Sequence, residues 1–449
     1  MQKILIANRG EIASRIIKTC KQLNIQTVAV YSDADQDMPF VKEADIAHRI
    51  GEAQVNRSYL VVENILEVAK KEKVDGIHPG YGLLSENADF AQKVTEEGFI
   101  FIGPAHSIIK KMGDKVEARK VMKEASVPVV PGSEAGVETL EEAKKTASGI
   151  GYPIMLKASA GGGGIGMIRC EDEQALVQSF DSTKNRAKAY FGKEEVFLEK
   201  CIENARHIEV QIFGDHHGNV VHLFERNCSV QRRNQKVIEE SPSPHLSNST
   251  KESMFEAAVK AGKAVNYSNA GTVEFIVDEQ ENFYFLEMNT RLQVEHPVTE
   301  SITGLDLVKW QILVASGEPL PLSKQEEVPF SGHSMEFRIY AEDPKTFYPS
   351  PGQLSTLQFG EAEDVRIDSG YEEGNKVTPF YDPMIAKCIV IGENRTDVIQ
   401  KAISFFEGVK IDGVKTNVSL FKDILSDSNF QTGNYTTKWL QDFLTANRT

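Results

Sequence analysis

The sequence predicts a protein of several α/β and α+β domains, with a Rossmann-like parallel sheet at the N-terminus and a β-rich region at the C-terminus. Strand-like and helical patterns alternate through the first hundred residues, as in a parallel sheet with covering helices. A glycine-rich segment between two strand-like runs follows, and then a series of alternating strands. The length of 449 residues allows about three domains.

The N-terminal region opens as strand, tight turn, helix and strand, from KILIANRGEIASRIIKTCKQL to TVAVYS. A helical pattern at 59–72 and the strands DGIHPG and FIFIGP continue the alternation. His78-Pro79-Gly80-Tyr81-Gly82 leaves a strand into a turn, where open α/β sheets bind ligands, although an ordinary structural turn explains it equally well. We expect a first domain at 1–113.

A helical pattern from Ile108 to Ala125 contains Lys115, which is either a solvated lysine or a phosphate ligand. The segment VPVVPGSEAG then reads as extended, because Pro128 and Pro131 disfavour helix on either side. We therefore expect a helix and linker at 114–130.

The segment YPIMLKASAGGGGIGMIRC satisfies G-x-G-x-x-G literally at Gly161, Gly163 and Gly166. A dinucleotide site needs that loop to open a helix, whereas here it joins two strand-like runs. The context favours a mobile flap whose backbone N–H groups close over phosphates, with Lys157 at its base. A flexible surface hairpin is the alternative. The flap region is expected at 131–203, ending with the strand VFLEKCI.

Next, HIEVQIFGDHHGNVVHLFERNCSVQRR predicts a hairpin of two alternating strands. His207 begins the first strand, and it either faces a ligand or is simply buried. The basic cluster QRRNQK, ending at Lys236, needs an anion or acidic neighbours in a chain of net charge −15. Cys228 reads as a small buried residue. A helix at 251–267 then leads into the last hairpin of this region, expected at 204–330.

The hairpin TVEFIV–DEQEN–FYFLEMN brings acidic side chains together. If Asp278 and Phe283 flank the loop, Glu274 and Glu287 lie directly opposite one another. Like charges in that position require compensation, and a divalent cation supplies it. Asn289 adds an oxygen ligand from the same face. Two carboxylates and an amide oxygen suit Mg²⁺ or Mn²⁺, whereas a solvated hairpin face is the alternative.

Composition narrows the class of protein. The net charge of −15 argues against nucleic-acid or membrane-surface partners. Five scattered cysteines without C-x-x-C spacing indicate a reducing compartment, and no signal peptide or membrane-spanning run is visible. We expect a cytoplasmic protein.

From 331 to 449 the sequence shows strands carrying FRIYAEDP and YDPMIAKCIVIG, a helix at 396–408 and a further helical stretch from Asn417. No E-x-M-K-M-type biotin-acceptor motif is present, and the length leaves no room for a carboxyltransferase domain. These features favour a free-standing subunit.

Taken together, ILIANRGEIA, HPGYGLLSEN, FIGP, MGDK, KASAGGGG, HIEVQ, CSVQRR, EMNTRLQVEHPVTE, FRIYAEDP and YDPMIAK closely resemble biotin carboxylases, the ATP-grasp components of biotin-dependent carboxylases. The resemblance spans nearly the whole chain. It implies a pre-ATP-grasp domain at 1–113, an ATP-grasp lid at 131–203, an ATP-grasp core at 204–330 and a β-rich C-terminal subdomain at 331–449.

The resemblance also implies roles for individual residues. Glu274, Glu287 and Asn289 would hold Mg²⁺ or Mn²⁺, and Tyr81 and Arg338 would contact biotin. Glu295 would be the general base toward bicarbonate. ATP would be bound by Lys115, Lys157, Gly162, Gly163, Gly164, Glu199, His207 and Gln231. Bicarbonate would be held by Lys236, Arg291, Gln293, Val294 and Glu295, of which Lys236, Arg291 and Glu295 are catalytic together with Arg338.

The implied reaction is the ATP- and bicarbonate-dependent carboxylation of biotin on a biotin carboxyl carrier protein, through carboxyphosphate. Acetyl-CoA carboxylase in fatty-acid synthesis is the favoured assembly, with separate carboxyltransferase subunits and a homodimer of this chain. Alternatives are a pyruvate or propionyl-CoA carboxylase, another ATP-grasp ligase, an oxidoreductase or an inactive paralogue.

Three positions depart from the family pattern. Ile165 stands where Arg is common in the flap, Asn234 where His is common in QRRHQK, and Asn227 where Asp is usual. We expect activity to be retained, with weaker binding of ATP.

Overall fold

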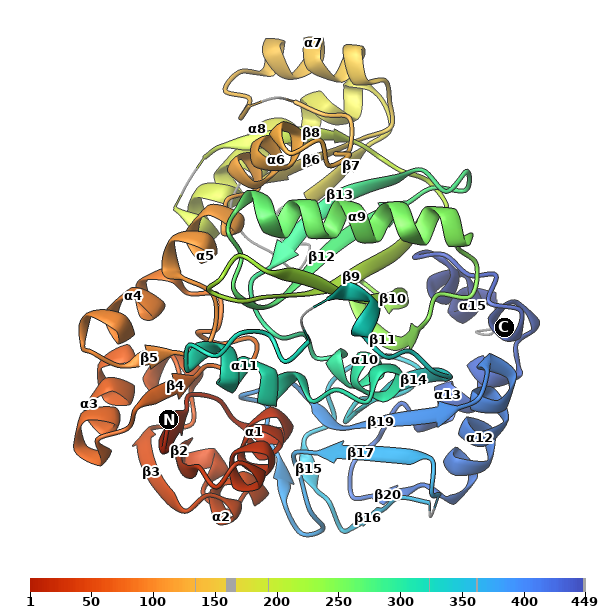
Figure 1. Cartoon of the computed structure of the whole chain (residues 1–449). Helices are drawn as coiled ribbons and strands as arrows, with labels where there is room; N and C mark the ends of the chain where they lie inside the picture. The colour runs from red at the N-terminus through yellow and green to blue at the C-terminus, as the bar shows by residue number, and fades with distance from the viewer. Residues whose placement is uncertain (134, 159–166, 193, 323, 361, 447–449) are drawn as a thin grey trace.

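The computed structural model describes residues 1–449 except 134, 159–166, 193, 323, 361 and 447–449. Figure 1 shows an N-terminal unit in red and orange, a small yellow unit at the top, a central green sheet and a blue C-terminal unit. The predicted multi-domain α/β and α+β fold is confirmed.

The N-terminal unit is a parallel sheet of five strands in the order β3-β2-β1-β4-β5, flanked by helices. Its central strand is buried on both faces, as a sheet covered on both sides requires. The elements are β1 (Lys3–Ile6), α1 (Gly10–Gln22), β2 (Gln26–Ser32), η1 (Asp33–Asp35), α2 (Pro39–Glu43), β3 (Ile46–Gly51), η2 (Val55–Arg57), α3 (Val62–Glu72), β4 (Gly76–His78), α4 (Ala88–Glu96) and β5 (Ile100–Phe101).

The single helix predicted from Ile108 to Ala125 is wrong. The structure has two helices, α5 (His106–Gly113) and α6 (Lys115–Glu124). Asp114 between them is extended, and its carboxylate accepts hydrogen bonds from the backbone N–H groups of Val116 and Glu117. This N-cap starts a new helix at Lys115.

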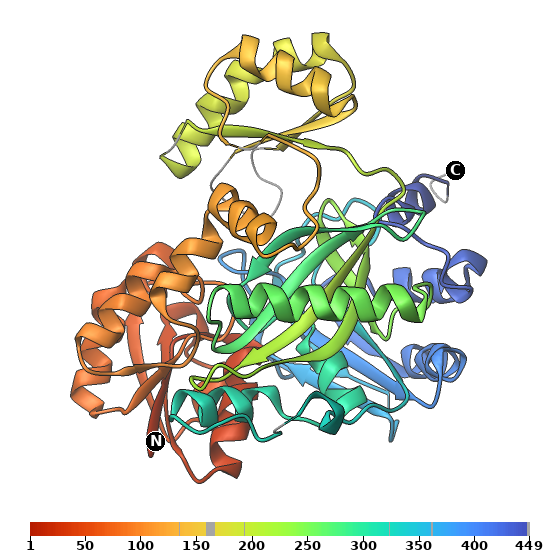
Figure 2. The same ribbon diagram turned by 45° about the horizontal axis from the view of Figure 1, so that its top comes forward.

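The small unit has its own hydrophobic core and an antiparallel sheet in the order β7-β6-β8, and Figure 2 shows it projecting from the body. Its elements are α7 (Leu140–Ile150), β6 (Ile154–Ala158), β7 (Met167–Cys170), α8 (Glu173–Phe191) and β8 (Val196–Lys200). Lys157 pairs with Met167, so the glycine segment joins two strands as predicted. Gly162, Gly163, Gly164 and Ile165 lie outside the described residues.

The central sheet contains β9 (Arg206–Gly214), β10 (Val220–Arg232), β11 (Gln235–Ser241), β12 (Asn269–Val277) and β13 (Phe283–Asn289). Helix α9 (Asn248–Ala264) covers one face (Figure 1). Ile208, Val210 and Ile212 of β9 belong to the apolar cluster that includes residues of α9. The alternate positions His207 and Glu209 therefore point to the opposite face, which carries the polar groups described below.

This sheet continues across residue 330. β11 pairs with β14 (His333–Tyr340), and β19 (Met384–Gly392) and β17 (Val365–Ser369) complete eight strands in the order β13-β12-β9-β10-β11-β14-β19-β17. The expected core and C-terminal region thus share one sheet. The remaining elements are α10 (His296–Thr303), α11 (Leu307–Ala315), η3 (Gln325–Glu327), β15 (Gly352–Gln353), β16 (Thr356–Gln358), β18 (Lys376–Val377), α12 (Arg395–Gly408), β20 (Lys410–Asp412), α13 (Val418–Ser426), α14 (Ser428–Gln431) and α15 (Trp439–Ala446).

The β12–β13 hairpin confirms one part of its predicted register and corrects another. Glu274 lies directly opposite Glu287, as predicted. At the turn, however, Phe283 pairs with Val277 and not with Asp278. Because Phe285 pairs with Phe275, Leu286 is an extra residue on β13. This β-bulge restores the expected pairing of the two glutamates.

All five cysteines are buried and unpaired, as expected for a chain without a disulfide framework. No helix in the described part of the chain has the length and apolar character needed to cross a bilayer.

Candidate active site

Lys236 lies at the centre of a buried group of carboxylates on the polar face of the central sheet. Its ammonium nitrogen is 2.7 Å from Glu209 Oε2, 3.2 Å from Glu274 Oε1 and 2.5 Å from Glu295 Oε1. Burial alone would lower the pKa of Lys236, but the surrounding anionic groups raise it well above its usual value. The ammonium therefore stays charged and holds three carboxylates together.

A bulge in β11 directs these side chains. Val230 of β10 pairs with Ile238, whereas the next residue, Gln231, pairs with Lys236. Val237 is therefore an extra residue on β11, and it shifts the alternation of side chains by one position. As a result, Lys236 and Glu239 both reach the polar face.

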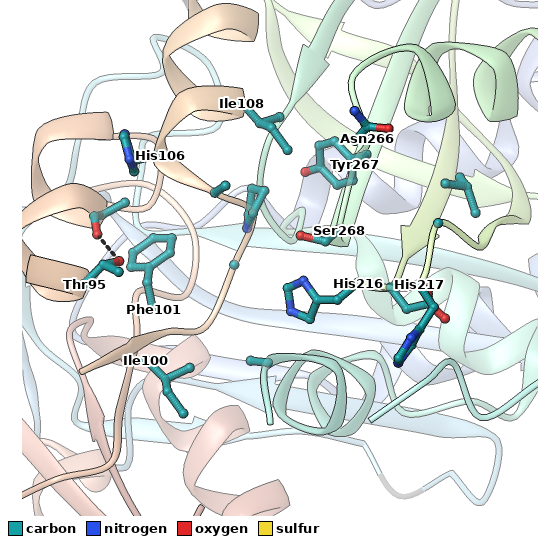
Figure 3. A pocket seen from close by; sticks show the side chains of 18 of the residues that line it. Thr95, Ile100, Phe101, His106, Ile108, His216, His217, Asn266, Tyr267 and Ser268 are labelled. Atoms are coloured by element: carbon teal, nitrogen blue, oxygen red, sulfur yellow. Dashed lines mark hydrogen bonds between the residues drawn. The ribbon is translucent and has the colours of Figure 1, made fainter. Parts of the chain in front are cut away.

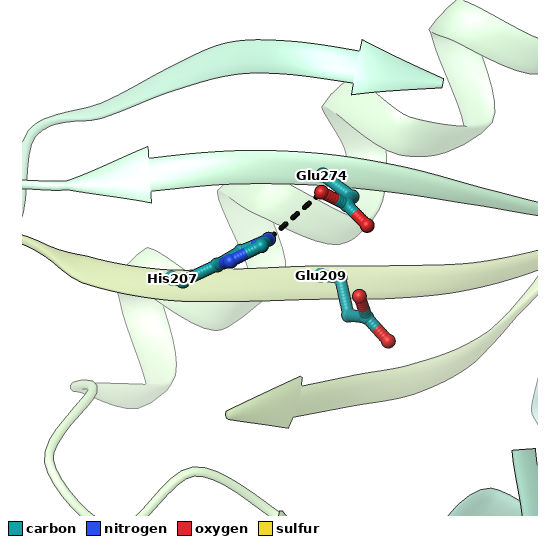
Figure 4. Close-up of side chains that lie close together, drawn as sticks. All are labelled: His207, Glu209 and Glu274. Atoms are coloured by element: carbon teal, nitrogen blue, oxygen red, sulfur yellow. Dashed lines mark hydrogen bonds and ion pairs between the residues drawn. The ribbon is translucent and has the colours of Figure 1, made fainter. Parts of the chain in front are cut away.

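The predicted metal ligands lie on neighbouring strands of this face. Glu274 accepts hydrogen bonds at 2.9 Å from Asn289 Nδ2 and contacts His207 Nε2 at the same distance. Figure 4 shows His207 reaching Glu274 beside Glu209. Glu287 is more exposed and lies 3.7 Å from the Lys115 ammonium.

The donor set fits a hard divalent cation. Burial alone would raise the pKa of Glu274, but Lys236 and His207 hold it well below its usual value, so the carboxylate is ionised. Glu287 and Asn289 line one cavity of about 390 Å³ with Lys115 and Arg291. Oxygen donors of this kind suit Mg²⁺. The alternative cluster of His207, Glu209 and Glu274 is less suitable, because Lys236 and Arg226 already contact Glu209.

The loop after β13 connects this cavity to the buried carboxylates. Arg291 donates hydrogen bonds to Asn289 Oδ1 at 2.9 Å and to Gln293 Oε1 at 2.6 Å. Gln293 in turn donates to Glu274 Oε1 at 2.9 Å. The carbonyl of Val294 accepts a hydrogen bond from Lys387 Nζ at 2.9 Å. Direct hydrogen bonds therefore link four predicted residues, namely Glu274, Asn289, Arg291 and Gln293.

Glu295 is the N-cap residue of α10 and lies between two basic side chains. One carboxylate oxygen contacts Lys236, and the other accepts a hydrogen bond from Arg338 Nη2 at 2.9 Å. Burial would raise the pKa of Glu295, yet Lys236 and Arg338 lower it well below its usual value. Glu295 is thus ionised and able to accept a proton.

Tyr81, Val294 and Arg338 line a second cavity of about 390 Å³. The glycine-rich turn presents Tyr81 there, with Asn8 Nδ2 donating to the carbonyl of Tyr81 at 2.8 Å. Gly80 has φ +63°, and a Cβ at this position would lie 2.8 Å from Asn8 Nδ2. The turn therefore requires glycine.

The residues predicted at the nucleotide contact several different partners. Lys157 contacts Glu199, which also lies 3.2 Å from Arg119. Gln231 Nε2 donates to the carbonyl of Cys228 at 3.3 Å. His207, which is also expected along the nucleotide, is hydrogen-bonded to Glu274 at 2.9 Å.

One departure from the family pattern, Asn234, has a local structural explanation. Arg233 and Asn234 are exposed and have φ of 50° and 64° between the paired residues Arg232 and Gln235. They form a two-residue turn that requires positive φ, and asparagine adopts this conformation readily. Asn227 is buried, and its side-chain oxygen accepts hydrogen bonds from the backbone and hydroxyl of Ser229, which an aspartate would also accept, so the structure does not explain this departure.

Several residues of the site were missed from the sequence, namely Glu11, Glu86, Glu209, Arg226 and Lys387. Glu86 accepts a hydrogen bond from Arg291 Nε at 2.9 Å, and Lys387 lies 3.1 Å from Glu11. A signal existed for Glu209, because HIEVQ places polar residues at every second position of a buried strand.

Cys228 is buried as predicted, with its Sγ 3.8 Å from Glu295 Oε1.

A larger cavity of about 880 Å³ lies away from this site, between the N-terminal unit and the β9–β10 turn. Figure 3 shows His216, Phe101 and Tyr267 around it. None of the predicted site residues lines it.

Comparison with known proteins identifies first the class and then the family. Residues 114–323 match the family model of the carbamoyl-phosphate synthase L chain, ATP binding domain, so the fold and site are those of an ATP-dependent ligase. Residues 1–109 match the N-terminal domain of biotin carboxylase, and residues 336–442 match its C-terminal domain. The chain belongs to the biotin carboxylase family.

Similar proteins include Biotin carboxylase 2 of Bacillus subtilis, 55% identical over 98% of this chain and 99% of that protein. The alpha subunit of mitochondrial methylcrotonoyl-CoA carboxylase of Arabidopsis thaliana is 51% identical over 98% of this chain, but only 60% of that subunit is covered. Among solved structures, the biotin carboxylase domain dimer of Hydrogenobacter thermophilus 2-oxoglutarate carboxylase, in complex with MgADP, ADP and bicarbonate, has a TM-score of 0.95. It is 48% identical, and the match covers 98% of this chain and 97% of that chain.

Proposed function

We propose that the site around Lys236 carboxylates biotin attached to a carrier protein, using ATP, Mg²⁺ and bicarbonate. The observation that carries this proposal is the contact of one carboxylate, Glu295, with both Lys236 and Arg338. Glu295 thereby joins the loop assigned to bicarbonate with the pocket assigned to biotin.

We assign the nucleotide end of the site to Lys115, Lys157, Glu199, His207, Gln231 and the glycine flap. Glu274, Glu287 and Asn289 would hold Mg²⁺, which when bound neutralises charge on the transferring phosphoryl group. Lys157 must then exchange its contact with Glu199 for a phosphate oxygen. His207 contacts Oε2 of Glu274, whereas Asn289 donates to Oε1.

Arg291, Lys236, Gln293 and the backbone of Val294 would hold bicarbonate. A bicarbonate oxygen attacks the γ-phosphorus of ATP, ADP leaves, and Glu295 accepts the bicarbonate proton, which produces carboxyphosphate. Lys236 and Arg338 suppress the basicity of Glu295. When the substrates engage these two basic side chains, the proton affinity of Glu295 rises, and the base becomes competent in the loaded site.

Carboxyphosphate then releases CO₂ and phosphate beside the cavity lined by Tyr81 and Arg338. The phosphate takes the N1′ proton of biotin, and N1′ attacks CO₂ to form carboxybiotin. Arg338 stabilises the negative charge that develops on the ureido oxygen. Tyr81 bounds the ring of biotin.

We propose that acetyl-CoA carboxylase is the assembly, with a biotin carboxyl carrier protein and carboxyltransferase subunits as partners and a homodimer of this chain. The near full-length match to a bacterial biotin carboxylase supports a separate subunit. The similarity to a methylcrotonoyl-CoA carboxylase subunit keeps another acyl acceptor as the alternative. We propose domains at 1–113, 131–203, 204–330 and 331–449, joined by the helix and linker at 114–130.

The first test is ADP release from MgATP with bicarbonate, measured with and without free biotin. Strong stimulation by biotin, abolished in Glu295→Ala, is the expected result. Bicarbonate-dependent hydrolysis that ignores both biotin and a biotinylated carrier would contradict the proposal and indicate another ATP-grasp ligase. Carboxyl transfer to acetyl-CoA, compared with propionyl-CoA and pyruvate in the reconstituted complex, tests the assembly.

A further inference from the structure

Behind Arg338, two glutamates face each other across neighbouring strands. Glu239 of β11 lies directly opposite Glu336 of β14. Both side chains are 0% exposed. Two ionised carboxylates in this cross-strand position would repel one another, and no solvent is present to screen them.

Their hydrogen bonding does not compensate for this burial. Of the four carboxylate oxygens of the pair, only Glu239 Oε1 has a donor within hydrogen-bonding distance among the residues that the structure describes, and that donor is Arg338 Nη2. Arg338 makes an ion-pair contact with Glu239, and its Nε lies 3.9 Å from Glu336 Oε1. Because Arg338 also contacts Glu295, one guanidinium faces three carboxyl groups.

The charged and titratable groups around the pair come from the surrounding strands and from the start of α10. They are Cys228, Lys236, Glu295, Arg338, Tyr340, Lys387 and Cys388. Burial raises the pKa of Glu239 to about 7 against the pull of Arg338. Burial likewise raises the pKa of Glu336 well above its usual value, although Lys387 opposes the shift.

From this geometry we infer that Glu239 and Glu336 hold at least one proton between them and act as positioning residues for Arg338 in the biotin-dependent step. The inference rests on the proposed role of Arg338 at biotin. When Glu239 and Glu336 both hold their protons, the pair adds no negative charge beside Arg338, and Glu295 is its one ionised partner among the three carboxyl groups. When Glu239 ionises while Glu336 keeps its proton, the new carboxylate draws the guanidinium back and weakens its field at the ureido oxygen.

The predicted pH dependence follows from this charge balance. A carboxyl with a raised pKa keeps its proton below that pKa and loses it as pH rises. The biotin-dependent rate of the native enzyme should therefore decrease at alkaline pH, relative to the rate of a variant that cannot ionise at position 239. Bicarbonate-dependent ATP hydrolysis without biotin should show no such difference.

The experiment compares the native enzyme with Glu239→Gln and Glu336→Gln, since glutamine is a neutral substitute of the same shape as a protonated glutamate. ADP release is measured from pH 6 to 9 with and without biotin. We expect the ratio of the biotin-dependent rates, Glu239→Gln over native, to rise about tenfold across this range. Glu336→Gln should stay within about threefold of native at neutral pH.

Infrared spectroscopy provides a readout that a purely structural role would not change. The difference spectrum of native minus Glu336→Gln at pH 8 should contain the carbonyl band of a protonated carboxylic acid. Glu240→Gln, one residue away from position 239, should instead remove only carboxylate bands. A missing acid band, or a rate ratio that does not change with pH, would overturn the inference. If native ADP release ignores biotin altogether, the proposed function fails, and the infrared result still decides whether the pair holds a proton.

Discussion

Glu239 and Glu240 are neighbours on β11, and both are buried, but they point to opposite faces of the sheet. On the face toward the C-terminal helices, Glu240 contacts His333 at 2.6 Å, Arg395 at 2.8 Å and the hydroxyl of Tyr435. Although burial opposes the charge, Arg395 and His333 lower the pKa of Glu240 to about 2. On the polar face, the ion-pair contact with Arg338 is the only one that Glu239 makes with a charged group in the described part of the chain, and burial raises its pKa to about 7.

The contrast between Glu240 and Glu239 shows that a buried carboxyl group can serve either stability or catalysis. Glu240 ties β11 to α12 and to the chain before α15, so its carboxylate stabilises the fold when it is fully satisfied. On the polar face, Glu239 and Glu336 lack such a set of donors among the residues that the structure describes, and buried carboxyl groups of this kind respond to substrates and protons. We expect substitutions on the two faces to separate stability from catalysis.

The largest effect is expected for Lys236→Met, because Lys236 contributes both to stability and to catalysis. Removal of the ammonium leaves Glu209, Glu274 and Glu295 facing one another without a cation. We expect the free energy of unfolding to fall by about 3–5 kcal/mol and bicarbonate-dependent ADP release to fall at least on the order of a hundredfold. Urea unfolding and ADP release measure the two effects.

Lys251→Met is the matched control for this variant. Lys251 is similarly buried and contacts a single carboxylate, Glu225, at 2.8 Å, away from the site. We expect it to lower stability less and to leave ADP release intact. The stability deficit of Lys236→Met should shrink between pH 7 and pH 5, because a carboxylate without its cation takes up a proton. A deficit that ignores pH would contradict this account of the cluster.

Glu240→Gln should lower stability by about 3 kcal/mol, because the neutral amide no longer balances Arg395 and His333. Trp439 packs against Tyr435 with ring centroids 5.9 Å apart, so its fluorescence reports unfolding of this region. The same change at the adjacent position, Glu239→Gln, should cost less than about 1 kcal/mol. Equal losses of unfolding free energy in Glu240→Gln and Glu239→Gln would contradict the proposal that the two faces of the sheet differ in their contribution to stability.

Acid pH should erase the advantage that Glu240 gives the native protein. Its pKa falls from 4.5 to about 2 on folding, so the stabilisation is complete above pH 4.5 and is lost as pH falls through 2. The difference in unfolding free energy between native and Glu240→Gln should therefore drop to about half near pH 3. A constant difference from pH 6 to pH 3 would show that folding does not lower the pKa of Glu240.

The sequence predicted the hairpin and the helices near the site only in part. The pairing of Glu274 with Glu287 was predicted by taking Asp278 and Phe283 as the residues that flank the loop, and it is correct because the bulge offsets the error at the turn. The prediction of the turn residues was wrong, since the bulge at Leu286 inserts one residue without disturbing the pattern on either side of it. The break before Lys115 did carry a signal, because Asp114 after Gly113 is a typical N-cap.

Glu239 and Glu240 could not be distinguished from the sequence. Simple alternation places Lys236 and Glu240 on one face of β11, and only the pairing with β10 shows that Val237 is extra. The pairing of β11 with β14 joins segments about a hundred residues apart. Such long-range pairing leaves no local pattern, so neither the facing of Glu239 and Glu336 nor the continuous sheet followed from residue order.

The smallest effect is expected at the exposed end of β11. Asn234→His restores the residue common in the family at a turn position with φ of 64°. Histidine tolerates this left-handed conformation less well than asparagine, so we expect a loss of at most about 1 kcal/mol in stability. The affinity for ATP, measured by calorimetry, should not change, because the side chain is exposed at the turn. Tighter ATP binding by the histidine variant would show that the turn moves onto the nucleotide, and that the native asparagine weakens this contact.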